Sequence, residues 1–127
     1  MSQATQCGVL CESIQSADFK SEKQVPVIEV KYQNKQGQPF TIEVSVGKEV
    51  AHPNTTEHFI QWIKLYYKNQ EGKFIYEIGK TEFNAHGASV QGANQGPAYS
   101  HPVASFNVTL NKPGVLIAES YCNIHGL

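Results

Sequence analysis

The stretch Phe40-Thr41-Ile42-Glu43-Val44-Ser45-Val46 decides the fold class. Ile42, Val44 and Val46 alternate with polar residues, so their side chains share one side of an extended chain. This period of two, built largely from β-branched residues, is typical of a strand with one face on a core and the other in water. Gly47 follows directly and ends the pattern. The stretch therefore predicts one strand of an antiparallel sheet.

Comparable runs lie on both sides of this strand. Five further stretches are rich in β-branched and aromatic residues, namely residues 25–32, 58–68, 74–83, 102–110 and 115–122. Residues 58–68 are apolar on both faces, which indicates a central strand. Gly79 is expected to mark a β-bulge, and the polar and glycine-containing residues 84–99 are expected to form a long loop. Short strands joined by Gly, Pro and Asn turns predict an all-β protein, an antiparallel β-sandwich of about seven strands.

Length and charge narrow the class of protein. A chain of 127 residues can bury a core as a single domain without help from a metal or a disulfide. We expect residues 1–20, which lack a clear period, to form an N-terminal arm, and residues 21–127 to form the domain. A net charge of −1 favours neither a nucleic acid nor an anionic membrane as partner.

The cysteine count and the N-terminal composition bear on location. No apolar run approaches the length of a membrane-spanning helix, and the first residues do not resemble a signal peptide. Three cysteines are too few for a disulfide scaffold, which indicates the reducing cytoplasm. Two of them, Cys7 and Cys11, are interpreted as ordinary thiols on the arm rather than as a metal site.

Two short motifs carry metal-binding chemistry. Cys122 and His125 are three residues apart, and Gly126 relieves the backbone directly behind them. His52 and His58 flank a Pro-Asn-Thr-Thr turn, so both can approach a common point from one loop. The alternation of residues 115–122 points the Cys122 thiol inward. Three imidazoles and one thiolate predict a transition-metal site.

These ligands leave several metals open. A blue-copper electron carrier uses one cysteine, two histidines and an axial methionine, whereas the single methionine of this chain is Met1 and it offers one histidine too many. A structural zinc site with one cysteine and three histidines fits the ligand types. The alternative function is accordingly a non-catalytic metal protein, either a zinc-stabilised sandwich or a cupredoxin-like electron carrier.

Several segments together resemble a known family. These are Glu22-Lys23-Gln24-Val25-Pro26, His52-Pro53-Asn54-Thr55-Thr56-Glu57-His58, Phe83-Asn84-Ala85-His86-Gly87, and residues 120–127. They are similar to superoxide reductases of the single-iron (neelaredoxin) type, which correspond to the iron domain of desulfoferrodoxin. The resemblance runs from about Phe19 to the C-terminus. It implies an immunoglobulin-like sandwich, so that residues 21–127 would form a single iron-binding domain.

The resemblance also implies a cofactor and its ligands. Members of this family hold a mononuclear non-haem iron (Fe²⁺/Fe³⁺) with four equatorial histidines and one axial cysteine. Carried over to this chain, His52, His58 and His125 would be equatorial ligands and Cys122 the axial one. His86 belongs to the family motif but is not a ligand there, which favours a loop-stabilising role.

The activity implied is the one-electron reduction of superoxide to hydrogen peroxide. Lys23 would attract the superoxide anion, and Glu22 would occupy the open iron position in the resting oxidised state. The family further implies a rubredoxin-like electron donor and a homotetramer.

One position departs from the family pattern. The motif before the first strand is Glu-Lys-His-Val-Pro in the family, and here Gln24 stands where the fourth histidine is expected. A glutamine oxygen is a poor substitute for a neutral imidazole beside a thiolate-ligated iron. The change is therefore expected to weaken iron binding, shift the potential and impair the enzyme.

Overall fold

The structure, a computed structural model, describes residues 25–31 and 37–127. This part of the chain contains no helix and six strands: β1 Val27–Val30, β2 Phe40–Ser45, β3 Ile60–Asn69, β4 Ile75–Glu82, β5 Val103–Val108 and β6 Gly114–Cys122. Nothing within it is long, helical and apolar enough to cross a membrane. The predicted N-terminal arm lies outside the described residues, and the proposed division of the chain stays a prediction.

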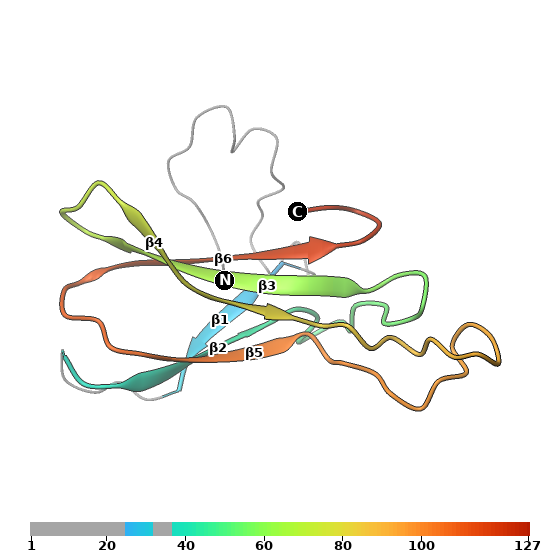
Figure 1. Cartoon of the computed structure of the whole chain (residues 1–127). Helices are drawn as coiled ribbons and strands as arrows, with labels where there is room; N and C mark the ends of the chain where they lie inside the picture. Colours follow the sequence, from blue (N-terminus) through green and yellow to red (C-terminus); the bar gives the residue numbers. More distant parts are fainter. Residues whose placement is uncertain (1–24, 32–36) are drawn as a thin grey trace.

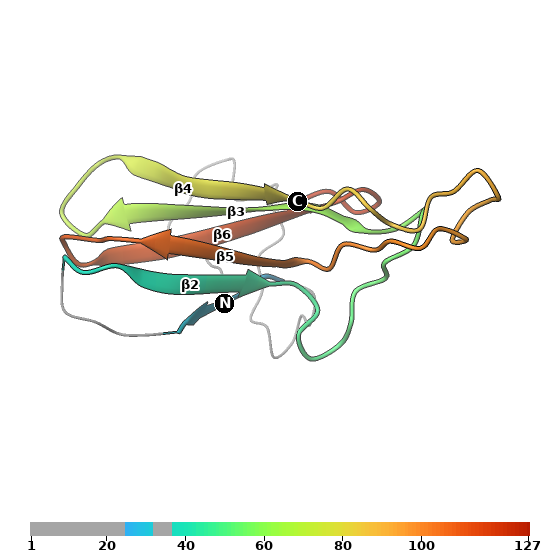
Figure 2. The ribbon, with the colours of Figure 1, turned by 60° about the horizontal axis from the view of Figure 1, so that its bottom comes forward.

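The strands form two antiparallel sheets that pack face to face. One has the order β1-β2-β5 and the other the order β4-β3-β6. Figures 1 and 2 show these sheets as two layers. The predicted all-β antiparallel sandwich is therefore confirmed, with six of the expected strands in the described part of the chain.

The core lies between the layers, where the sequence pattern placed it. Ile42 and Val44 from β2 are completely buried and face Ile63 and Leu65 from β3. Strand β5 alternates strictly between exposed and buried positions, as its sequence predicts. Strand β3 lies between β4 and β6, which confirms the prediction that it is central.

Two details of β3 depend on local contacts. The predicted strand begins at residue 58, whereas β3 begins at Ile60, because the main chain of His58 hydrogen-bonds to Thr55 and is held in a turn. The predicted bulge is present: the register of β3 with β4 shifts between Leu65 and Tyr66, opposite Gly79. A Cβ at Gly79 would lie 2.9 Å from a ring carbon of Phe106, so the absence of a side chain at Gly79 leaves room for this ring from the other sheet.

The sandwich gathers three connecting segments at one end. The segment between β2 and β3, the long loop between β4 and β5, and the C-terminal turn after β6 all leave the right-hand end of the molecule in Figure 1. The same three segments lie together in the second view (Figure 2). This end carries both motifs that the sequence assigns to metal binding.

The core predicts how sharply stability depends on single side chains. Ile63→Ala should lower the free energy of unfolding by about 2–5 kcal/mol, since Ile63 is fully buried between the sheets and its loss leaves a cavity. Urea unfolding of the metal-free protein measures this. The control is Val90→Ala at a fully exposed position, which should change stability by less than about 0.5 kcal/mol. Equal effects of the two changes would contradict the assigned core.

Candidate metal centre

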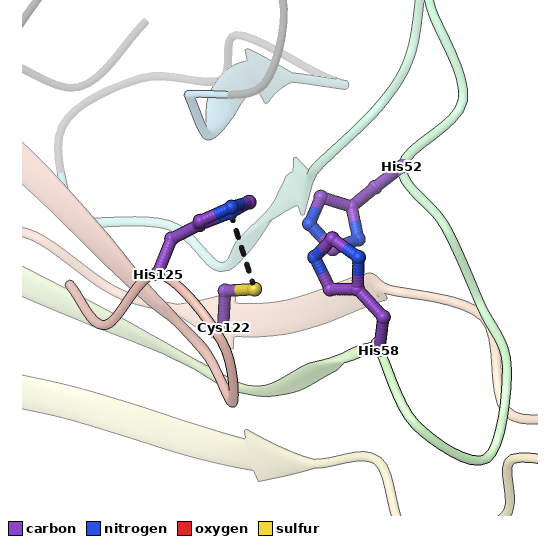
Figure 3. A group of neighbouring side chains, drawn as sticks. All are labelled: His52, His58, Cys122 and His125. Carbon is purple, nitrogen blue, oxygen red and sulfur yellow. Dashed lines mark hydrogen bonds between the residues drawn. The ribbon is translucent and has the colours of Figure 1, made fainter.

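Four side chains from two distant segments meet at this end of the sandwich. One ligand atom from each of His52, His58, Cys122 and His125 lies within 4.8 Å of the others. Figure 3 shows the two histidines of the segment before β3 facing the cysteine and histidine at the end of the chain. The ring centroid of His58 is 4.8 Å from that of His52 and 5.0 Å from that of His125, edge to face in both cases.

Residues 52–58, which carry His52 and His58, form the histidine loop. Hydrogen bonds within this loop hold it in place. Thr55 accepts a bond from the His58 N–H through its hydroxyl (3.0 Å) and donates its own N–H to the His58 carbonyl (2.9 Å). The Nδ1 atom of His52 lies 2.7 Å from the carbonyl oxygen of Pro53, so Nδ1 carries the proton. The other nitrogen of His52, Nε2, is then an acceptor available to a metal ion.

The C-terminal loop is equally tight. Cys122 and Gly126 exchange two main-chain hydrogen bonds, of 2.9 and 2.8 Å. Gly126 has φ +78°, in the left-handed region that glycine adopts without strain. The turn brings His125 Nδ1 to 3.8 Å from the sulfur of Cys122. Two potential ligands therefore come from one five-residue loop.

One polar atom of the cluster is buried without a hydrogen-bond partner. This atom is His58 Nε2, and such an arrangement costs about 1–3 kcal/mol. The Cys122 side chain is also buried. A metal ion between the four side chains would bond to this nitrogen and to the sulfur, so the donor set fits a single transition-metal ion.

The electrostatics of the cluster favour the neutral ring that a metal requires. Burial is the main reason that the pKa of His52 lies below its ordinary value, and the neighbouring His58 and His125 lower it further. The bond to Pro53 acts in the opposite direction without cancelling this. Because only a neutral imidazole binds a metal, His52 stays competent as a ligand to a lower pH than a free histidine.

The structure thus brings together all four residues that the sequence singles out as ligands, while their metal-binding role stays a proposal. Glu22, Lys23 and Gln24 lie outside the described residues, as do Cys7 and Cys11. Nothing in the structure bears on their predicted roles.

A hydrogen-bond network behind the histidine loop was not predicted. His86 is buried, with Nδ1 2.7 Å from Asn54 Oδ1, Nε2 2.6 Å from the Phe83 carbonyl and its ring stacked on Phe59. Asn54 also donates to the carbonyl of Ser100 (2.9 Å). His86 therefore holds the long loop against the histidine loop and is not part of the cluster, which agrees with its expected loop-stabilising role. The sequence predicts Asn54 as part of a turn, and no sequence rule points to a partner so far along the chain.

Comparison with known proteins places the chain in a family. The desulfoferrodoxin family model matches residues 16–127. The chain belongs to the desulfoferrodoxin family. The neelaredoxin of Megalodesulfovibrio gigas is 49% identical over 118 residues, covering 93% of this chain and 91% of the relative. The superoxide reductase of Pyrococcus furiosus is 48% identical over 119 residues, covering 94% of each chain.

A solved structure of the desulfoferrodoxin family supports the fold. The reduced form of the superoxide reductase (neelaredoxin) from Archaeoglobus fulgidus superposes with a TM-score of 0.81 at 54% identity, covering 88% of this chain and 89% of the other. The fold of this chain is therefore similar to that of the Archaeoglobus fulgidus protein over most of both chains.

The cluster predicts which residues hold a metal. His58→Ala should weaken binding of cobalt(II) or iron(II) at least about tenfold, since it removes the buried nitrogen that lacks any other partner. Metal content after anaerobic loading and competition with a chelator measures this.

The matched control is His101→Ala, because His101 is exposed and lies outside the cluster. It should bind metal like the unaltered protein. Unchanged metal affinity in the His58 variant would refute the proposed ligand set.

Proposed function

We propose that this protein is a superoxide reductase that converts superoxide to hydrogen peroxide at a mononuclear iron held by His52, His58, His125 and Cys122. The observation that carries the proposal is that three imidazoles and one thiol lie close together, and that the buried Nε2 of one of them, His58, has no hydrogen-bond partner. Family membership supports it, since relatives about half identical to this chain over most of its length bear the names neelaredoxin and superoxide reductase. Iron bound there would supply the single electron, and two protons complete the peroxide.

The described residues each have a part in this chemistry. Cys122 provides a thiolate, the form in which cysteine binds metals, and its burial keeps this electron-rich donor away from water. His52 and His58 are held by main-chain contacts, so their rings need little rearrangement when the metal binds. His125 is exposed, which leaves one side of the cluster accessible to a small anion.

Two charged residues are proposed from the family resemblance. Lys23 would attract superoxide and stabilise negative charge as it develops on the reacting oxygen atoms. Glu22 would close the open position in the resting oxidised state. The Glu22-Lys23 pair directly precedes Gln24. The proposed roles of both side chains therefore depend on whether Gln24 binds the iron.

The supply of electrons and the assembly are also part of the proposal. A rubredoxin-like carrier as electron donor, a homotetramer and a cytoplasmic location are supported by the family resemblance. The small number of cysteines further supports a reducing compartment.

Gln24→His tests the donor set and the activity together. Both the unaltered protein and the variant should take up about one iron per chain, show a visible thiolate-to-ferric band and consume superoxide. The variant should bind iron at least about tenfold more tightly, because an imidazole replaces a weak amide oxygen. Iron analysis, visible spectra and stopped-flow mixing with superoxide measure these outcomes.

The control is Cys122→Ser, which should lose the visible band. If iron binds only to the Gln24→His protein, the unaltered chain is not an active reductase. If the unaltered chain retains zinc and rejects iron, the non-catalytic zinc-stabilised alternative replaces the proposed function.

A further inference from the structure

The side chain of Asn123 grips the main chain on both sides of His58. Its Nδ2 donates to the carbonyl oxygen of Glu57 (2.8 Å), and its Oδ1 accepts from the N–H of Phe59 (2.8 Å). The Asn123 main-chain N–H adds a third bond, to the Phe59 carbonyl (3.2 Å). One residue therefore binds the peptide groups that precede and follow a proposed metal ligand.

The main-chain N–H and carbonyl of His58 itself are also hydrogen-bonded. Its N–H donates to the Thr55 hydroxyl (3.0 Å), and its carbonyl accepts from the Thr55 N–H (2.9 Å). The backbone of His58 is thus held by Thr55 within its own loop and by Asn123 from outside it. In contrast, the buried Nε2 of the ring has no partner. These contacts fix the backbone position of His58 and leave its Nε2 atom available to a metal ion.

Asn123 directly follows Cys122, which gives these contacts a consequence for the metal. Cys122 is itself fixed by its two bonds to Gly126. The Asn123 side chain therefore connects two proposed ligands, although Phe59 and Asn123 are 64 positions apart in the chain. Any shift of this contact changes the separation between the sulfur of Cys122 and the ring of His58.

We propose that Asn123 is a positioning residue that sets this separation and thereby tunes the bond between the metal and the Cys122 thiolate. The inference rests on the metal site of the proposed function. Only a side chain with a donor and an acceptor on one short planar group can make both contacts. Aspartate lacks the donor, alanine lacks both, and glutamine is longer by one methylene group.

The test compares Asn123→Ala with Asn69→Ala in the full chain loaded with cobalt(II). Asn69 is a matched control, because its side chain also bonds to the main chain (the N–H of Glu71, 3.2 Å) but stands at the opposite end of β3 from the cluster. The readouts are the energy of the thiolate-to-cobalt charge-transfer band and the cobalt affinity in competition with a chelator. Neither requires enzymatic activity.

Asn123→Ala should bind cobalt about 10–100-fold more weakly and shift the charge-transfer band, as expected when a group that orients a ligand is removed. Asn69→Ala should match the unaltered protein in both. Asn123→Asp keeps the acceptor for the Phe59 N–H and should lie between the two, which also provides a decisive variant if the alanine protein does not fold. Circular dichroism establishes that each variant is folded.

Two outcomes overturn the inference in different ways. If folded Asn123→Ala and Asn123→Asp proteins bind cobalt with unchanged affinity and an unshifted band, Asn123 does not position the ligands, although the metal site stands. If the unaltered protein shows no thiolate band, the proposed metal site fails and the inference fails with it.

Discussion

The antiparallel pairing of β3 with β6 is the constraint on which the candidate centre depends. It sets Ile60, the first residue of β3, opposite Cys122, the last residue of β6. Because the strands run in opposite directions, the loop before β3 and the loop after β6 emerge at the same end of the sheet. The hydrogen-bonded pairing of β3 with β6 therefore also brings His58 close to Cys122. A slip of one residue would turn the thiol away from the core.

The rest of the sandwich stabilises this pairing. Ile63 and Leu65 alternate with outward residues on β3 and insert between the sheets, which sets the register of the strand against its neighbours. The bulge at Gly79 keeps β4 paired with β3, and the missing Cβ of Gly79 leaves room for Phe106 of the second sheet. The end of the sandwich is then free to hold polar groups that a core would not tolerate. A buried ring nitrogen without a partner is unfavourable there unless a metal binds it.

The hydrogen bonds around the cluster are of two kinds, those within the histidine loop and those that attach it to the long loop between β4 and β5. Pro53 and Thr55 organise the histidine loop from within, whereas Asn54 and Thr56 attach it to the long loop between β4 and β5 through His86. Most of these contacts involve main-chain groups. The loop is thus held in place while Nε2 of His58 keeps no competing bond, an arrangement that favours metal binding without large rearrangement.

The amino-acid sequence by itself determined the alternation of β2 and β5, the bulge at Gly79, and the identity of the four candidate ligands. These features are local: a side-chain period, a glycine, or a motif a few residues long can be read without knowing the rest of the molecule. The family resemblance likewise rests on such motifs. Only the tertiary structure decided how the two predicted ligand motifs meet, that β3 starts after the turn at His58, and through which contacts Asn54, His86 and Asn123 hold the site. Those contacts join residues 32 to 64 positions apart. Hydrogen bonds across such separations leave no periodic trace, because they arise from strand pairing and loop packing rather than from neighbouring residues.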